Sequence, residues 1–196
     1  MPRVAIALSG SFALVVIVLH IVRTDVDPLT RGVSRYAVGP HGYVVNGAFL
    51  LLALALVETG IGFRRVAPNV GTIGVWLLWA SAVGMALVAL FPLRSADSPG
   101  AENLPHQLGG MIFFLATAAA TVVLSRATGR LTVVAWSIAA VVTVYFLSIG
   151  VRPLGLAGIR GLLQRACFAA IVTWLVLVNA AGGREPHRRQ SASSTP

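Results

Sequence analysis

The sequence contains the stretch VVNGAFLLLALALVETGIGF at residues 44–63, in which Glu58 is the only charged side chain. An α-helix rises about 1.5 Å per residue and the hydrocarbon core of a bilayer is about 30 Å thick, so a run of this length can cross a membrane once. The stretch therefore predicts a transmembrane helix.

Five further apolar runs have a similar length. They lie at residues 4–22, 70–90, 106–124, 131–149 and 162–181. Helices are favoured over strands, because a segment in lipid must satisfy its backbone hydrogen bonds internally and these runs lack the two-residue alternation of a barrel strand. The first run follows Arg3, as in a signal peptide, but no small-x-small cleavage site follows it. The fold class that we predict is all-α, a polytopic transmembrane bundle of six helices.

The composition supports the same class of protein. Of the 196 residues, 57% are hydrophobic and 11% are charged, and the mean hydropathy is +0.84. Soluble domains carry about 25% charged residues, so the composition is typical of a membrane protein, and its expected partner is the lipid bilayer. The formal net charge of +9 does not indicate nucleic acid, because the arginines are scattered between apolar runs. The single cysteine, Cys167, lies inside an apolar run and is interpreted as a small core residue.

We expect one transmembrane domain over residues 1–181 and a basic, disordered cytoplasmic tail over residues 182–196. The tail changes abruptly to polar, basic and small residues, a composition that cannot bury enough apolar surface to fold. Within the domain, small residues such as Gly84, Gly109 and Gly110 should allow close helix packing, since lipid gives little hydrophobic drive for association.

The distribution of arginine predicts the orientation in the cell membrane. An even number of helices places both termini on one side, and the turns 64–69 and 125–130 on that side carry two arginines in six residues each. Short loops on the cytoplasmic side of membrane proteins are rich in arginine and lysine, so these two turns favour a cytoplasmic location for both termini. The arginines on this side are Arg3, Arg64, Arg65, Arg126, Arg130, Arg184, Arg188 and Arg189.

The opposite, outer face gathers the candidate ligand-binding or structural residues at similar depth. They are His20, Asp25, Asp27, Ser34, Tyr36, His41, His106 and Arg165. Arginine is costly inside an apolar helix unless it lies near an end, where it can snorkel or pair with a carboxylate. Arg165 is therefore expected to pair with Asp25 or Asp27, either to join the sixth helix to the first loop or to bind an anionic headgroup.

Imidazole and carboxylate side chains are also common zinc ligands, and a zinc-bound water could support hydrolysis. The sequence has no HExxH motif or comparable pair that fixes two ligands on one helical face, so we assign no metal ligand. A bis-histidine haem is disfavoured because His20 and His106 lie at helix ends. The cofactor stays undetermined.

Glu58 is the only acidic residue inside an apolar run. Carboxylates within membranes often serve proton or cation paths, although a transporter would more typically show several buried polar residues and broken helices. Snorkelling toward Arg64 and Arg65 is our preferred interpretation, and proton-linked transport is the alternative.

Several short motifs occur in a characteristic order along the chain. They are Ser34-Arg-Tyr36 and Gly42 before the second run, Phe91-Pro92 after the third, His106 opening the fourth and Gly161-Leu-Leu-Gln-Arg165 opening the sixth. In this order the chain resembles the six-helix prokaryotic membrane family catalogued as domain of unknown function 998, over roughly residues 4–181. The resemblance implies a compact bundle in which Ser34, Tyr36, His106 and Arg165 face one another. Where a family member typically has an acid after the Phe-Pro, this chain has Arg94, with Asp97 as a possible substitute.

The family has no established activity to transfer. Our interpretation is a membrane protein of unestablished activity that offers a polar pocket on its outer face to a lipid or small amphiphile. One alternative is a metal-dependent lipid hydrolase that resembles the ceramidase and progestin-receptor superfamily in its use of Ser, His and Asp. The other is a small transporter that uses Glu58.

Overall fold

The computed structural model describes residues 2–66, 71–94, 103–129, 131–150 and 155–182. Six long α-helices dominate this part of the chain, and all six are long and apolar enough to span a membrane. They are α1 (Pro2–Val22), α2 (Gly42–Val66), α3 (Thr72–Leu90), α4 (Leu104–Thr128), α5 (Thr132–Gly150) and α6 (Arg160–Gly182). The predicted all-α bundle of six transmembrane helices is confirmed.

Two short 3₁₀ helices complete the described structure, η1 (Val33–Ala37) between α1 and α2 and η4 (Leu156–Ile159) before α6. The predicted boundaries are correct to within a few residues. The helix α4 begins at Leu104, two residues before the predicted run. Pro105 fits in the first turn of a helix, because the N–H that proline lacks would have no partner there. The predicted tail lies outside the described residues, except for Gly182, which ends α6.

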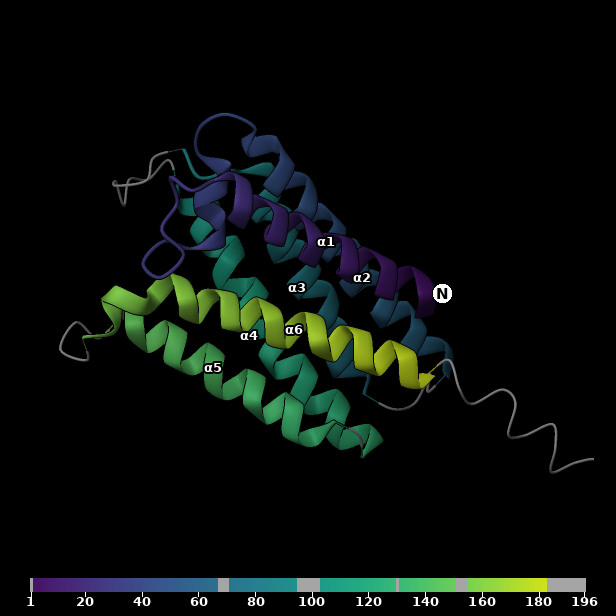
Figure 1. The fold of residues 1–196 in the computed structure, drawn as a ribbon. Helices are drawn as coiled ribbons and strands as arrows, with labels where there is room; N and C mark the ends of the chain where they lie inside the picture. The colour runs from purple at the N-terminus through teal and green to yellow at the C-terminus, as the bar shows by residue number, and fades with distance from the viewer. Residues whose placement is uncertain (1, 67–70, 95–102, 130, 151–154, 183–196) are drawn as a thin grey trace, which may run out of the picture.

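The helices form a closed ring in which each packs against the next in sequence, and α6 packs against α1 (Figure 1). The start of α1 and the end of α6 lie at the same end of the bundle. The loop between α1 and α2, with η1, lies at the opposite end (Figure 1). We call these two ends the terminal end and the loop end.

The closest helix pair is α3 with α4, and glycine makes this approach possible. A Cβ atom on Gly109 would lie 2.6 Å from the carbonyl oxygen of Gly84, so neither position has room for a side chain. Ser81 on α3 also donates to the carbonyl of Phe113 at 3.1 Å and contacts the hydroxyl of Thr117. The small-residue packing expected at Gly84 and Gly109 is confirmed, whereas a Cβ on Gly110 would meet nothing within 4 Å.

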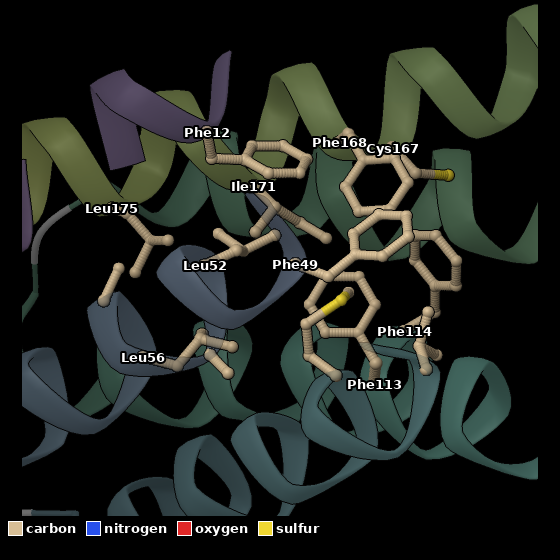
Figure 2. Close-up of a cluster of buried hydrophobic side chains, with 14 of the residues drawn as sticks. Phe12, Phe49, Leu52, Leu56, Phe113, Phe114, Cys167, Phe168, Ile171 and Leu175 are labelled. Carbon is tan, nitrogen blue, oxygen red and sulfur yellow. The ribbon is translucent and has the colours of Figure 1, made fainter. Parts of the chain in front are cut away.

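Aromatic side chains fill the centre of the ring (Figure 2). Phe168 on α6 is the common member, and its ring centroid lies 5.2–6.2 Å from four other phenylalanine rings. These rings belong to Phe12, Phe49, Phe113 and Phe114, which come from α1, α2 and α4. Cys167 is buried beside them, as expected for a core residue. This core fixes where the end of α1 and the start of α6 meet, and the polar site is built at that junction.

Candidate functional site at the docked first loop

Residues 23–41, which we call loop one, form an ordered structure held from inside by Arg23. The Arg23 guanidinium binds both carboxylate oxygens of Asp25, at 2.7 and 2.8 Å. It also donates to the backbone carbonyls of Tyr36, Val38 and Pro40 at 2.9–3.3 Å. The hydrogen bond from Arg23 lowers the pKa of Asp25 below its ordinary value. One arginine therefore joins the two ends of the loop.

The other predicted carboxylate, Asp27, organises the turn that follows it. Its oxygens accept from the Leu29 backbone N–H at 3.0 Å and from the Thr30 hydroxyl at 2.5 Å. These bonds, led by that from Thr30, lower the pKa of Asp27. Arg165 also attracts Asp27 electrostatically, as the weakest of these influences.

The start of α6 docks against loop one through its backbone. A Cβ atom on Gly161 would lie 2.4 Å from the carbonyl oxygen of Arg31, so only glycine permits this approach. The next residue, Leu162, donates its backbone N–H to the carbonyl of Leu29 at 3.1 Å. The loop chain thus lies in direct contact with the first turn of α6.

Gln164 extends this docking with its side chain, which is buried. Its Oε1 accepts from the Val33 backbone N–H at 2.7 Å, and its Nε2 donates to the Tyr145 hydroxyl at 2.9 Å. Gly32 leaves room for the amide, since a Cβ there would lie 2.3 Å from Oε1. A single side chain therefore connects loop one, α5 and α6.

Arg165 makes the largest set of contacts at the site. Its Nε donates to Nε2 of His20 at 2.6 Å, and its Nη2 donates to the Tyr36 hydroxyl at 3.3 Å. Its Nη1 donates to the backbone carbonyls of Pro28, Arg31 and Gly161. The guanidinium also lies 5.8 Å from the centre of the Tyr36 ring. Arg165 therefore joins α6 to α1 and to loop one, including its helix η1.

The expected ion pair between Arg165 and Asp25 or Asp27 is wrong, although the expected connection between α6 and loop one is present. Each carboxylate instead has a partner within three residues, Arg23 for Asp25 and Thr30 for Asp27. Such local bonds close very short loops and so cost little chain entropy. Arg165 is left with neutral acceptors, and the hydrogen bonds it makes do not cancel its charge.

His20 is held in one tautomer by its two partners. Its Nδ1 lies 3.0 Å from the carbonyl oxygen of Val16, which can only accept, so Nδ1 carries the proton. Its Nε2 then has the free lone pair that accepts from Arg165. The imidazole ring also lies edge-on to Tyr36, with 5.6 Å between ring centroids. His20, Tyr36 and Arg165 thus form one contact group, which we call the arginine cluster.

The remaining predicted residues do not join the arginine cluster. Ser34 lies in η1, two residues before Tyr36. His41 is exposed and lies 3.4 Å from the Tyr43 hydroxyl. His106 is buried, with its Nδ1 3.0 Å from the carbonyl of Phe91, where it satisfies a free acceptor at the end of α3. The family resemblance implied that Tyr36 and Arg165 face each other, and the structure shows this contact. It also implied that His106 faces them, whereas the hydrogen bond of His106 is to the Phe91 carbonyl at the end of α3.

The loop end carries an excess of positive charge. Among the described residues there it holds two aspartates, Asp25 and Asp27, and the arginines Arg23, Arg31, Arg35, Arg94, Arg160 and Arg165. Arg35 is distinctive, because its Nη1 is buried and has no hydrogen-bond partner within the described residues. A buried charged donor normally has a partner, so Arg35 is an exception among the described charged groups.

No group of three His, Cys, Asp or Glu side chains within the described ranges lies close enough to hold a metal ion. In α2, Glu58 is half-buried and has no ion pair or hydrogen bond with any other described residue. Beside it, Asn179 donates to the Thr59 hydroxyl at 2.9 Å. Arg64, one of the expected partners of Glu58, has its guanidinium 5.7 Å from the centre of the Trp79 ring.

Reasoning from sequence missed Arg23, Gln164 and Tyr145 as members of the polar network. Arg23 follows α1 directly and is one of many arginines, so its type alone gave no signal. Gln164 lies in the Gly161-Leu-Leu-Gln-Arg165 motif, which offered a usable signal. In the structure four residues of this motif contact loop one.

The fold and the site define a polytopic, multi-pass α-helical membrane protein with a docked, arginine-rich loop at one end. The chain matches the family model described as "Protein of unknown function (DUF998)" over residues 6–181, and it belongs to that family. No curated protein and no solved structure matches the chain. The family establishes no activity, so function must be argued from the site.

Proposed function

We propose that this membrane protein binds the anionic headgroup of a lipid or small amphiphile at its loop end, on the outer face of the cell membrane. The observation that carries the proposal is the buried Nη1 of Arg35, which has no partner among the described residues. Phosphate and carboxylate oxygens are the preferred acceptors of a guanidinium, since the hydrogen bonds are charge-assisted. An anionic headgroup would satisfy this donor.

The charge around Arg35 favours an anion in the same way. Arg165 donates to neutral groups, so its charge adds to the field at this end of the bundle. Asp25 is attracted to Arg35, but Asp25 already forms a bidentate pair with Arg23. Among the described residues of the loop end, the positive charge therefore exceeds what Asp25 and Asp27 can neutralise.

The position of the site favours an amphiphile over a free ion. Loop one begins where the transmembrane helix α1 ends, so its polar groups lie at the level where lipid headgroups occur. Exposed apolar side chains such as Ile21 and Leu162 lie next to it, and lipid chains can cover them. A ligand with an anionic head and an apolar tail matches both surfaces.

Lipid binding is tested with the purified full-length protein and nanodiscs that contain either phosphatidylglycerol or phosphatidylcholine. Native mass spectrometry should detect retained phosphatidylglycerol in preference to phosphatidylcholine. Arg35→Gln should weaken this retention by tenfold or more, because a charge-assisted hydrogen bond contributes about 1.5–3 kcal/mol. The matched control is Arg94→Gln, which removes the same charge from an exposed residue at the same end.

Two outcomes would contradict the proposal. Equal retention of both lipids would show that the headgroup charge is not recognised. An equal loss from Arg35→Gln and Arg94→Gln would show a general effect of charge, with no site at Arg35.

A second candidate, proton-linked transport, is favoured only by Glu58, a half-buried carboxylate without a partner in the described residues. Proton-coupled uptake into proteoliposomes that is lost in Glu58→Gln would support it. The metal-dependent hydrolase gains no support from the described residues, which bring no three candidate ligands together.

A further inference from the structure

We infer that His20 is a proton-operated latch, so that protonation of its imidazole releases Arg165 and undocks loop one from α6. The inference gives the proposed headgroup site its regulation, and it rests on the proposed function only for the consequence that ligand is released. The undocking itself follows from the contacts of His20.

The first step is the chemistry of the hydrogen bond. Arg165 has only N–H donors, so the bond of 2.6 Å to His20 exists only while Nε2 keeps its lone pair. A proton on Nε2 converts the acceptor into a second donor. It also places two cations in contact, which replaces an attraction with a repulsion.

The second step is that His20 has no alternative arrangement that keeps the bond. A flip of the ring tautomer would put the proton on Nε2 and would turn the Nδ1 lone pair toward the Val16 carbonyl. Both contacts are then lost together. The docked state therefore requires the neutral imidazole with the proton on Nδ1.

The surrounding groups leave the added charge without a direct partner. The groups that face His20 are Arg165 from α6 and Tyr36 from η1. In loop one, Asp25 is bound to Arg23 and Asp27 is bound to Thr30. At the start of α2, the titratable residues His41 and Tyr43 are exposed and contact each other. A carboxylate would have to leave its own partner to neutralise a protonated His20.

The third step is the position of Arg165 in the docking interface. The same guanidinium donates to the carbonyls of Pro28 and Arg31 and to the Tyr36 hydroxyl. Moving it away from a charged His20 breaks these contacts with loop one as well. Protonation of the His20 imidazole therefore opens the latch. Arg35 is part of η1, so the headgroup site loses its geometry when the loop undocks.

The test is hydrogen exchange of the lipid-free protein at pH 7.5 and pH 5.5, corrected for the intrinsic effect of pH on exchange. The parent should lose protection at least tenfold in loop one at pH 5.5, in particular at the Val33 N–H that binds Gln164. His20→Gln should keep its protection, because a glutamine oxygen accepts from Arg165 and does not titrate. His41→Gln is the matched control, since it removes an exposed histidine of the same loop, and it should behave like the parent.

A measurement on the parent protein makes the test independent of the variant. The ¹⁵N chemical shifts of the His20 ring should show a protonated Nδ1 and a bare Nε2 at pH 7.5. Nε2 should become protonated over the pH range in which loop one loses protection. The inference is overturned if the parent keeps its protection at pH 5.5, if a folded His20→Gln loses it like the parent, or if Nε2 carries the proton at pH 7.5.

Failure of the latch and failure of the proposed function are distinguishable. Lipid retention is measured at the single pH of 7.5, and exchange is measured without lipid. If the protein shows no lipid selectivity but does show the pH response, only the proposed headgroup site is contradicted. If it shows lipid selectivity but no pH response, only the latch is contradicted.

Discussion

At the scale of single residues, arginine has two different roles at the loop end. Arg23 neutralises Asp25 and shapes loop one from within. Arg165 binds only neutral oxygens and one imidazole, and so connects α6, α1 and loop one without losing its charge. Five N–H donors in a planar fork make this possible, and an ammonium group could not reach all of these acceptors.

The first residue-scale prediction compares Arg165→Ala with Glu58→Gln. Arg165→Ala leaves the part-buried acceptors at His20, Tyr36 and Gly161 without this donor, at a cost of about 1–3 kcal/mol for each that water cannot reach. Its melting temperature should fall by about 5–10 °C, on the usual scale of a few degrees per kcal/mol. Glu58→Gln breaks no contact with a described residue and should melt close to the parent.

Arg165→Lys should recover only part of the loss, because lysine cannot donate to His20 and to the loop carbonyls together. Melting is followed by tryptophan fluorescence in one detergent. If Arg165→Ala melts like the parent and Glu58→Gln does not, the arginine cluster is not the polar centre of the bundle.

At the scale of helices, the chain uses glycine where two backbones touch and leaves other glycines free. The neighbours Gly109 and Gly110 on α4 illustrate this difference. Gly109 faces Gly84 on α3, whereas a Cβ on Gly110 would meet open space. Successive residues of a helix point in different directions, so adjacent glycines serve different functions.

Gly109→Ala and Gly110→Ala therefore form a matched pair. A Cβ on Gly109 would lie 2.6 Å from a backbone oxygen and 3.1 Å from the Val88 nitrogen, so α3 and α4 must separate. We expect a loss of about 1–3 kcal/mol, as for other overpacked cores. Gly110→Ala should be neutral or stabilising by up to about 1 kcal/mol, from its helix propensity. Unfolding in a denaturing detergent measures both, and equal losses would contradict the assigned contact.

At the scale of the whole molecule, the closed ring places the start of α1 and the end of α6 at the terminal end and loop one at the loop end (Figure 1). Two arginine–aromatic contacts occur at the terminal end, Arg64 with Trp79 and Arg126 with Trp136. Arginine and tryptophan are both common where a helix meets the membrane surface. The orientation itself rests on the density of arginine in the short loops of the terminal end, from which we propose that this end faces the cytoplasm.

Reporter fusions test this orientation. Alkaline phosphatase fused after Asn69 should be inactive, because the end of α2 and the start of α3 lie at the terminal end, and a fusion after Ser98 should be active. Fluorescent-protein fusions at the same two positions give the complementary control. Activity after Asn69 with none after Ser98 would reverse the topology and move the headgroup site to the cytoplasmic leaflet.

The sequence alone determined the class of protein, the number of spanning helices in the described chain and the end at which polar residues gather. Each of these depends on run length, hydropathy or residue order. The number of membrane crossings follows from comparing the length of each apolar run with the thickness of the bilayer. The motif that contains Arg165 also identified the right part of α6, although not its partners.

Only the tertiary structure decided which polar groups meet. Arg165 contacts His20 across 145 positions of sequence, and Gln164 contacts Val33 across 131. Opposite charge predicted a carboxylate partner for Arg165. In the structure, Asp25 and Asp27 are bound instead by Arg23 and Thr30, which lie within three residues of them in the sequence. The acceptors that Arg165 uses are mostly backbone carbonyls. Every residue carries one, so the packing of α6 against loop one, and not the residue type, selects which carbonyls it binds.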